Sequence, residues 1–169
     1  PDDDPDNQTL LFLFPETLAG TAPYLRSDVK IELGARSDNE PAEEVAIHPY
    51  LAEAFPDVLG PSDFPVRMLS QERTFWEKAM LLHEETFRPS DKKKRKARMA
   101  RHYYDLWCLI SKGIARKAVA NEEIFARTAE HRKIYFNWSW MDYSTLKRGS
   151  LRLLPADGQE IEWRQDYEA

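Results

Sequence analysis

The pattern of apolar and polar residues predicts strands in the first third of the chain and helices in the remainder. Residues 9–14 form a nearly continuous apolar run, and residues 29–33 alternate between apolar and polar side chains, as in a strand with one covered face. A glycine and a proline lie between these two runs and are typical of a hairpin-like loop. Residues 44–47 are expected to form a further strand and residues 51–55 a short helix.

Residues 73–87 have the spacing of an amphipathic helix. At about 100° per residue, Phe75, Ala79 and Leu82 form one apolar stripe, and Lys78 falls on the flank of that stripe. Ser70 is placed to cap the first turn. A lysine on the flank either extends its stem to reach water or contacts an anion.

Residues 97–110 predict a second helix and residues 121–131 a third. The expected core face of the second helix comprises Met99, Tyr103, Leu106, Trp107 and Ile110. Asp105 is then expected to point away from the core, one turn after Arg101. A surface pair of these two residues would contribute only about 0.3 to 0.5 kcal/mol.

An aromatic cluster follows the third helix and consists of Tyr135, Phe136, Trp138, Trp140 and Tyr143. A packed core or a lid is the favoured interpretation, because large aromatic rings bury much apolar area. A platform on which nucleic-acid bases stack is the alternative.

The composition is that of one soluble domain, or of one domain with part of another. With 169 residues, 42% hydrophobic and 12% aromatic, a core forms only if most aromatic rings are inside it. The single cysteine, Cys108, excludes an internal disulfide and a cysteine-based zinc site, and the four histidines show no metal-ligand spacing. No apolar stretch approaches the roughly 20 residues of a membrane span, and no signal peptide opens the chain. We therefore expect a cytoplasmic protein with no metal site and no membrane contact.

The net charge of −5 conceals a strongly basic segment. Seven of the ten residues from 92 to 101 are basic: Lys92, Lys93, Lys94, Arg95, Lys96, Arg98 and Arg101. Such a run is typical of a solvated loop. It is also typical of a surface that binds phosphates, since clustered cations release counterions from a polyanion.

Two short motifs give the chain a resemblance to a known family. Phe75-Trp76-Glu77-Lys78 on the first helix and Arg101-His102-Tyr103-Tyr104-Asp105 on the second resemble the third and fourth conserved motifs of the nucleotidyltransferase AbiEii/AbiGii toxins of type IV toxin–antitoxin pairs. Upstream, residues 29–36 are similar to the family strand that carries an acidic residue, here Glu32. Downstream, the resemblance continues through Tyr135-Phe136, Asp142-Tyr143, residues 151–155 and Asp166-Tyr167.

The chain also departs from that family's pattern. Family members begin with a Gly-Ser loop and an Asp-x-Asp strand that holds the catalytic metals, whereas here Asp2, Asp3 and Asp4 lie between two prolines with no apolar strand around them. We expect a C-terminal piece of a longer toxin with an α+β fold. Residues 1–65 would be a remnant of the nucleotidyltransferase sheet, with a few strands from its edge. Residues 66–169 would form a mainly helical domain.

The resemblance implies transfer of a nucleotidyl group from a nucleoside triphosphate to an acceptor, with the 3′ end of tRNA as the expected acceptor. Lys78 is implied to contact the triphosphate, and Glu32 to be a supporting acid. Asp105 would act either as a general base or by orienting Lys78 or Arg101. Mg²⁺ is expected for the full-length family member but not bound by this chain, which should be inactive alone. Arg101 and the run Lys92 to Lys96 are the expected nucleotide- or RNA-binding residues. The alternatives are a non-catalytic nucleotide-binding or nucleic-acid-binding module, or a helical half that docks against an antitoxin.

Overall fold

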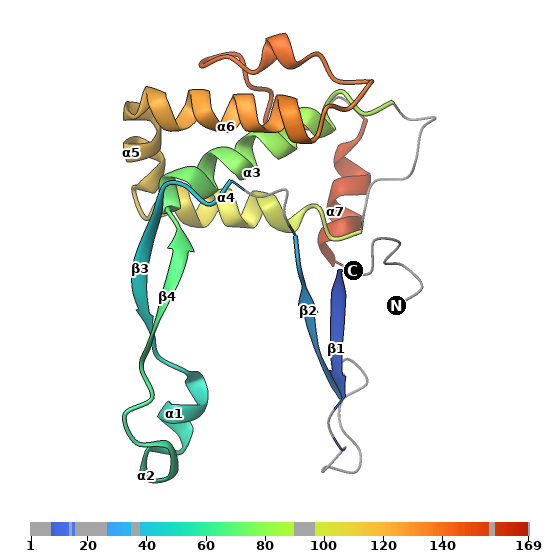
Figure 1. Cartoon of the computed structure of the whole chain (residues 1–169). Coiled ribbons are helices and arrows are strands. Elements are labelled where there is room, and N and C mark those ends of the chain that lie inside the picture. The colour runs from blue at the N-terminus through green and yellow to red at the C-terminus, as the bar shows by residue number, and fades with distance from the viewer. Residues whose placement is uncertain are drawn as a thin grey trace. The chain divides into compact units, whose positions relative to one another are not determined.

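The computed structural model describes residues 8–13, 15, 27–34, 38–89, 97–155 and 158–168. The chain divides into two compact units, Pro1–Ser37 and Asp38–Ala169. Two small antiparallel sheets and a set of helices give it a mixed architecture, so the expected α+β class is confirmed (Figure 1). The domain boundary expected between residues 65 and 66 stays a prediction.

The first unit contains one hairpin. Strand β1 (Thr9–Leu13) pairs with strand β2 (Asp28–Glu32), and Leu11 lies opposite Lys30 in the register. Both strands and their antiparallel pairing are confirmed. The predicted loop between them lies outside the described residues. A two-stranded sheet has little stability of its own, and the proposal that these strands edge a larger sheet is untested.

The second unit opens with a hairpin made by β3 (Ala42–Ile47) and β4 (Phe64–Leu69), in which Val45 lies opposite Val66. Two short helices, α1 (Tyr50–Ala54) and α2 (Pro56–Leu59), connect the strands. The predicted strand at residues 44–47 and the short helix after it are confirmed. Strand β4 was not predicted, because it contains Pro65, which removes one backbone donor. A strand of a two-stranded sheet tolerates that loss at its open edge.

The helical part is built around α3 (Gln71–Glu85), which contacts α4 (Arg101–Ser111), α5 (Ile114–Ala120) and α6 (Glu122–Tyr135) (Figure 1). A short 3-10 turn, η1 (Tyr143–Thr145), and α7 (Glu160–Glu168) follow. Ser70 caps α3 as predicted, since its Oγ accepts a hydrogen bond of 3.2 Å from the Arg73 backbone. Helix α5 was not predicted. It begins directly after Gly113, whose φ of 76° ends α4 in the left-handed region.

The core surrounds α3. Met80 and Leu82 are fully buried, and each contributes about 1.5 to 3 kcal/mol by leaving water. Trp76 packs edge-on against Phe125 of α6 and donates its indole N–H to the Ala118 carbonyl of α5 at 3.1 Å. The remaining core members come from α3, from α4 and the residue before it, from the segment between α6 and α7, and from α7: Phe75, Ala79, Ala100, Leu106, Met141, Leu146 and Trp163.

The predicted core face of α4 was wrong in part. Leu106 is buried, and Met99 and Tyr103 pack against the core, but Trp107 and Ile110 are 61% and 56% exposed. His102 is buried instead. The helix presents His102, Leu106 and Leu109 to its neighbours, which brings Asp105 towards α3 rather than away from it. Apolar residues surround most of α4, so their spacing alone did not select the buried face.

The start of α4 is held by the C-terminal helix. No side chain of α4 caps its own N-terminus, but the Asp166 carboxylate of α7 accepts hydrogen bonds from the backbone N–H groups of Arg98, at 2.6 Å, and Ala100, at 2.7 Å. Trp163 of α7 packs edge-on against Tyr103 of α4. These contacts fix the end of α4 that carries His102 and Asp105. None of the helices within the described residues is long and apolar enough to span a membrane.

Candidate functional site

Lys78, His102 and Asp105 meet between α3 and α4. The Lys78 Nζ lies 3.1 Å from the Asp105 Oδ2 and 3.1 Å from the His102 Nδ1. His102 Nδ1 is in turn 3.3 Å from Asp105 Oδ2. The structure therefore brings together the two residues that the sequence singled out, and adds a histidine between them. The expected surface pair of Asp105 with Arg101 was wrong.

The protonation of this cluster follows from its geometry. A single imidazole nitrogen cannot both accept a proton from Lys78 and donate one to Asp105. Burial, followed by the positive charge of Lys78, holds the pKa of His102 below its usual value. The ring is therefore neutral at pH 7, and its Nδ1 accepts from the Lys78 ammonium. Lys78 then donates to both neighbours.

Asp105 stays ionised in this arrangement. Burial raises the pKa of its carboxyl, but the hydrogen bond and the positive charge of the adjacent Lys78 ammonium act in the opposite direction, and the pKa lies below its usual value. A carboxylate with a lowered pKa is a weak general base. Of the roles left open by the sequence, this favours orientation of Lys78. The two side chains are 27% and 38% exposed, so the pair is reachable from solvent.

A buried network of ion pairs holds the elements around this cluster. Arg132 of α6 donates two hydrogen bonds of 2.6 Å to Glu84 and one of 3.1 Å to Glu77, both on α3. Glu77 also accepts from Arg73 at 2.7 Å. Since Glu77 directly precedes Lys78, these bonds fix the turn of α3 that presents the lysine.

The network extends to the segment before β3. Asp38 accepts from the fully buried Arg73 at 2.9 Å and from Arg127 of α6 at 2.6 Å. The hydrogen bonds from Arg127, and then those from Arg73, outweigh burial and place the pKa of Asp38 well below its usual range. Asp38 thus joins the first residues of the second unit to α3 and α6 as a permanent anion.

A pocket of about 260 Å³ adjoins the cluster and shares His102 with it. Helices α3, α4 and α6 and the loop after α6 form its walls, which comprise Leu81, Glu84, Glu85, Arg88, Met99, Arg101, His102, Arg132, Phe136 and Trp138. Both acids are neutralised, Glu84 by Arg132 and Glu85 by Arg88. The lining therefore combines aromatic rings with a positive charge beside Lys78.

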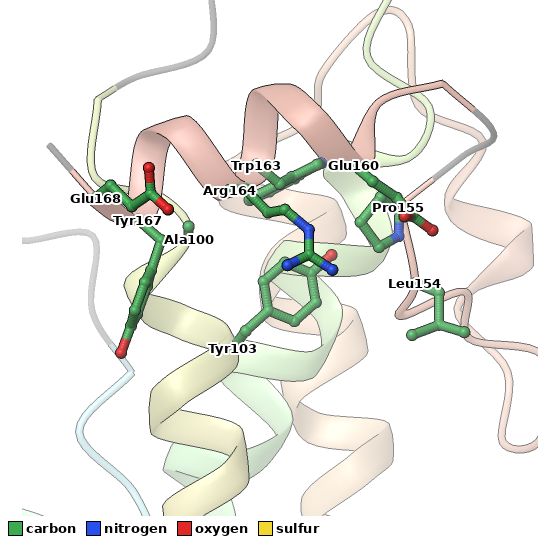
Figure 2. A pocket seen from close by; sticks show the side chains of 9 residues that line it. All are labelled: Ala100, Tyr103, Leu154, Pro155, Glu160, Trp163, Arg164, Tyr167 and Glu168. Carbon is green, nitrogen blue, oxygen red and sulfur yellow. The ribbon is translucent and has the colours of Figure 1, made fainter.

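A larger pocket, of about 410 Å³, lies on another side of α4, between α4, α7 and the segment around Pro155 (Figure 2). Figure 2 shows that Arg164 of α7 and Tyr103 of α4 both line this pocket. Its lining carries Glu160 and Glu168 against the single cation Arg164, and the remaining residues are apolar or aromatic. A negative balance does not suit a triphosphate, so size alone does not make this pocket the site.

The other predicted site residues are Glu32, Arg101 and the run Lys92 to Lys96. Glu32 lies in the first unit and pairs with Lys30 at 2.8 Å. Arg101 lines the 260 Å³ pocket, and no ion pair of its side chain appears among the residues described. The run Lys92 to Lys96 falls outside the described residues.

The described residues contain no group of three or more His, Cys, Asp or Glu side chains that could hold a metal ion. The cluster itself offers one carboxylate, already neutralised by Lys78. Mg²⁺ prefers one or two free carboxylates together with water and phosphate oxygens. These residues therefore do not fit Mg²⁺, and no step at this cluster is derived through a metal.

His102, Glu84 and Arg132 were missed by sequence reasoning. The spacing of three between His102 and Asp105 places both on one face of a helix, and this was an available signal. No local signal joins Arg132 to Glu84, which lie 48 residues apart. His83, another buried histidine, is structural: its Nδ1 accepts from the Arg152 backbone at 2.8 Å, and Nε2 lies 3.0 Å from the Thr145 hydroxyl.

Comparison with known proteins identifies one family. A family model described as nucleotidyl transferase AbiEii toxin, type IV TA system, matches residues 1–169. No curated protein and no solved structure matches the chain. The matched range includes Lys78, His102 and Asp105, the three residues that the fold brings together.

Proposed function

We propose that this chain, which belongs to the nucleotidyl transferase AbiEii toxin family of type IV toxin–antitoxin systems, uses Lys78 to bind the triphosphate of a nucleoside triphosphate. The observation that carries the proposal is the position of the Lys78 ammonium, 3.1 Å from Asp105 and reachable from solvent. The ammonium donates to the carboxylate and to the neutral imidazole, and these two hydrogen bonds fix its position. Because an ammonium has three N–H donors, one is left for a ligand.

The reaction requires charge to be offset on the diphosphate that leaves. The acceptor hydroxyl oxygen forms a bond to the α-phosphorus as its proton leaves, and the bond from that phosphorus to the bridging oxygen breaks. Diphosphate carries away the electron pair. Lys78 contributes a positive charge to the triphosphate oxygens, and its effect is greatest where negative charge develops. The Mg²⁺ that supports such transfers would be held by carboxylates outside this cluster.

Asp105 is a positioning residue in this proposal. Its lowered pKa keeps Asp105 charged at neutral pH. The carboxylate therefore holds the Lys78 ammonium in place and does not take a proton from the acceptor. The acceptor we propose is the 3′ end of tRNA. The partner we propose is a cognate antitoxin, as the family description implies.

Calorimetric titration with nucleoside triphosphates tests the role of Lys78. Lys78→Ala should weaken triphosphate binding by about tenfold, because a partly exposed charge-assisted hydrogen bond lies near the low end of 1.5 to 3 kcal/mol. Lys117→Ala, which removes a cation from the exposed side of α5, should leave binding unchanged. Both variants should fold normally, with Lys78→Ala losing less than about 1 kcal/mol. Equal affinity of Lys78→Ala and the wild type would refute the assignment.

Asp105→Asn separates the two roles of the carboxylate. Orientation of Lys78 predicts that triphosphate binding weakens several-fold, towards the value of Lys78→Ala, since both variants lose the same ion pair. A general base predicts unchanged binding and loss of transfer only. The isolated 169-residue chain should show no incorporation of labelled nucleotide into total tRNA with Mg²⁺, because its described residues offer no metal-binding carboxylate group. Clear incorporation would contradict this expectation.

A further inference from the structure

The 260 Å³ pocket beside His102 has the components of a binding site for a planar ring. Aliphatic Leu81 and Met99 form part of its wall, and Phe136 and Trp138 supply aromatic surface. Its volume is below the range of roughly 300 to 1,000 Å³ that holds drug-sized ligands. It therefore suits a single ring system rather than a whole nucleotide.

Trp138 is held as a rigid aromatic surface. Its ring stacks on Trp140, with centroids 5.8 Å apart and planes 10° apart, and Arg88 lies over Trp140 at 4.9 Å. The Trp138 backbone N–H donates to the Tyr143 hydroxyl at 3.1 Å. Asn137 turns the chain after α6 through a φ of 40°, a left-handed conformation that asparagine tolerates. Despite these contacts Trp138 is 42% exposed, so it is not a core residue.

The charges of the pocket leave one cation for a ligand. Three arginines line it against two glutamates, and Arg132 and Arg88 are each paired with one of those acids. Arg101 is the third arginine, and no ion pair of its side chain appears in the described parts of the chain. A planar guanidinium recognises phosphate oxygens and also stacks on rings.

We propose that this pocket binds a nucleobase, which stacks on Trp138 while Arg101 contacts the phosphate attached to it. The proposal rests on the proposed function, because the pocket lies directly beside the lysine that would bind a triphosphate. His102 is the residue that the pocket and the cluster share: it lines the pocket, and its Nδ1 contacts Lys78. A nucleotide bound with its base in the pocket has its phosphates towards Arg101 and Lys78.

The base could come from the nucleoside triphosphate or from the terminal nucleotide of an RNA acceptor. The pocket can accept a base from either ligand. Stacking on an aromatic side chain accepts every base, since each base has a π-face. The experiment therefore uses both ligands.

Titration of the full 169-residue chain is the test. The probes are a nucleoside triphosphate, ribose triphosphate, which lacks the base, and a short single-stranded RNA with a free 3′ end. The protein variants are Trp138→Ala and Trp138→Phe. Trp107→Ala is the matched control, because Trp107 is also an exposed tryptophan but does not line the pocket. Binding is measured by calorimetry, and circular dichroism checks the fold of each variant.

Trp138→Ala should weaken binding of a base-bearing ligand by about 5- to 160-fold and leave ribose triphosphate binding unchanged. Trp138→Phe should recover most of the affinity, and Trp107→Ala should lose none. A loss confined to the nucleoside triphosphate assigns the pocket to the base of the substrate. A loss confined to RNA assigns it to the acceptor.

Three results would overturn the proposal. The first is that the wild type binds no base-bearing ligand, and the second is that it binds nucleoside triphosphate and ribose triphosphate equally and does not bind RNA. The third is that Trp138→Ala binds base-bearing ligands as tightly as the wild type does. If ribose triphosphate binding depends on Lys78 and Trp138→Ala binds like the wild type, this inference is wrong and the proposed function stands. If binding requires the base but is insensitive to Lys78→Ala, the proposed function is wrong and this inference stands. The two proposals therefore fail separately.

Discussion

Removal of Arg132 should be among the most damaging single substitutions in the second unit. Arg132 is 3% exposed, and its guanidinium donates two hydrogen bonds of 2.6 Å to Glu84, which is 2% exposed. It also lies over the Phe136 ring at 4.3 Å. Arg132→Met keeps much of the side-chain volume, so the main change is loss of the partner of a buried carboxylate.

The expected cost of Arg132→Met is about 3 to 5 kcal/mol, the usual range when one member of a buried pair is removed. For a chain of this length each kcal/mol lowers the Tm by about 2 to 4 °C, so the Tm should fall by roughly 6 to 20 °C. The matched control is Arg148→Met. Arg148 pairs with Glu122 at the surface, with side chains 36% and 80% exposed, so its loss should cost no more than about 1 kcal/mol.

The stability lost in Arg132→Met should increase as the pH rises. Burial raises the pKa of Glu84, and the hydrogen bonds from Arg132 oppose that rise. Without Arg132 the folded-state pKa of Glu84 lies well above its unfolded value of about 4.3. Between those two values the folded state holds more protons than the unfolded state, so stability falls as pH rises. The deficit of Arg132→Met relative to wild type should therefore be smaller near pH 5 than at pH 8.

A double variant checks the physical cause. Glu84→Leu added to Arg132→Met removes the orphaned carboxylate, and should restore most of the lost stability, since apolar replacement of a buried pair is often neutral or stabilising. Chemical denaturation of the wild type, the Arg132→Met and Glu84→Leu single variants and the double variant gives the four free energies of the cycle at each pH value. A loss under 1 kcal/mol for Arg132→Met with no pH dependence, or a double variant as unstable as the single one, would show that this reasoning is wrong.

Two further predictions concern α4 and the basic segment. Asp166→Ala should lower the free energy of unfolding by about 0.5 to 2 kcal/mol, because the backbone N–H groups of Arg98 and Ala100 lose their acceptor. Hydrogen exchange at residues 98–102 should accelerate in this variant and not in the control Glu168→Ala. Equal exchange in the two variants would contradict the capping role. Neutralising Lys92 to Lys96 should weaken tRNA binding and flatten its salt dependence, lowering the slope of log K against log salt by up to about 3.5 if all five cations contact single-stranded phosphates. Lys78→Ala should leave that slope nearly unchanged. A slope that does not change when the four lysines and one arginine are neutralised would assign RNA binding to another part of the chain.

The sequence by itself determined the features that depend on neighbours close along the chain. Alternation over residues 29–33 predicted β2, the helical stripe of Phe75, Ala79 and Leu82 predicted α3, and Ser70 was recognised as its cap. The family was also recognised from short motifs around Lys78 and Asp105, and the family match bears that out. Each of these signals lies within one or two turns of the residue it describes.

Only the tertiary structure decided which face of α4 is buried and what Asp105 contacts. Apolar residues surround that helix, and the choice between its faces came from α3 on one side and α7 on the other. Lys78 and His102 lie 24 residues apart, Arg132 and Glu84 lie 48 apart, and Asp166 lies 66 residues from Ala100. Buried charges at such separations are stable only when the fold supplies their partners, because an unpaired charge pays the full cost of leaving water. These partners are brought together only by the folded chain, so no periodic pattern in the sequence indicates which residues will pair.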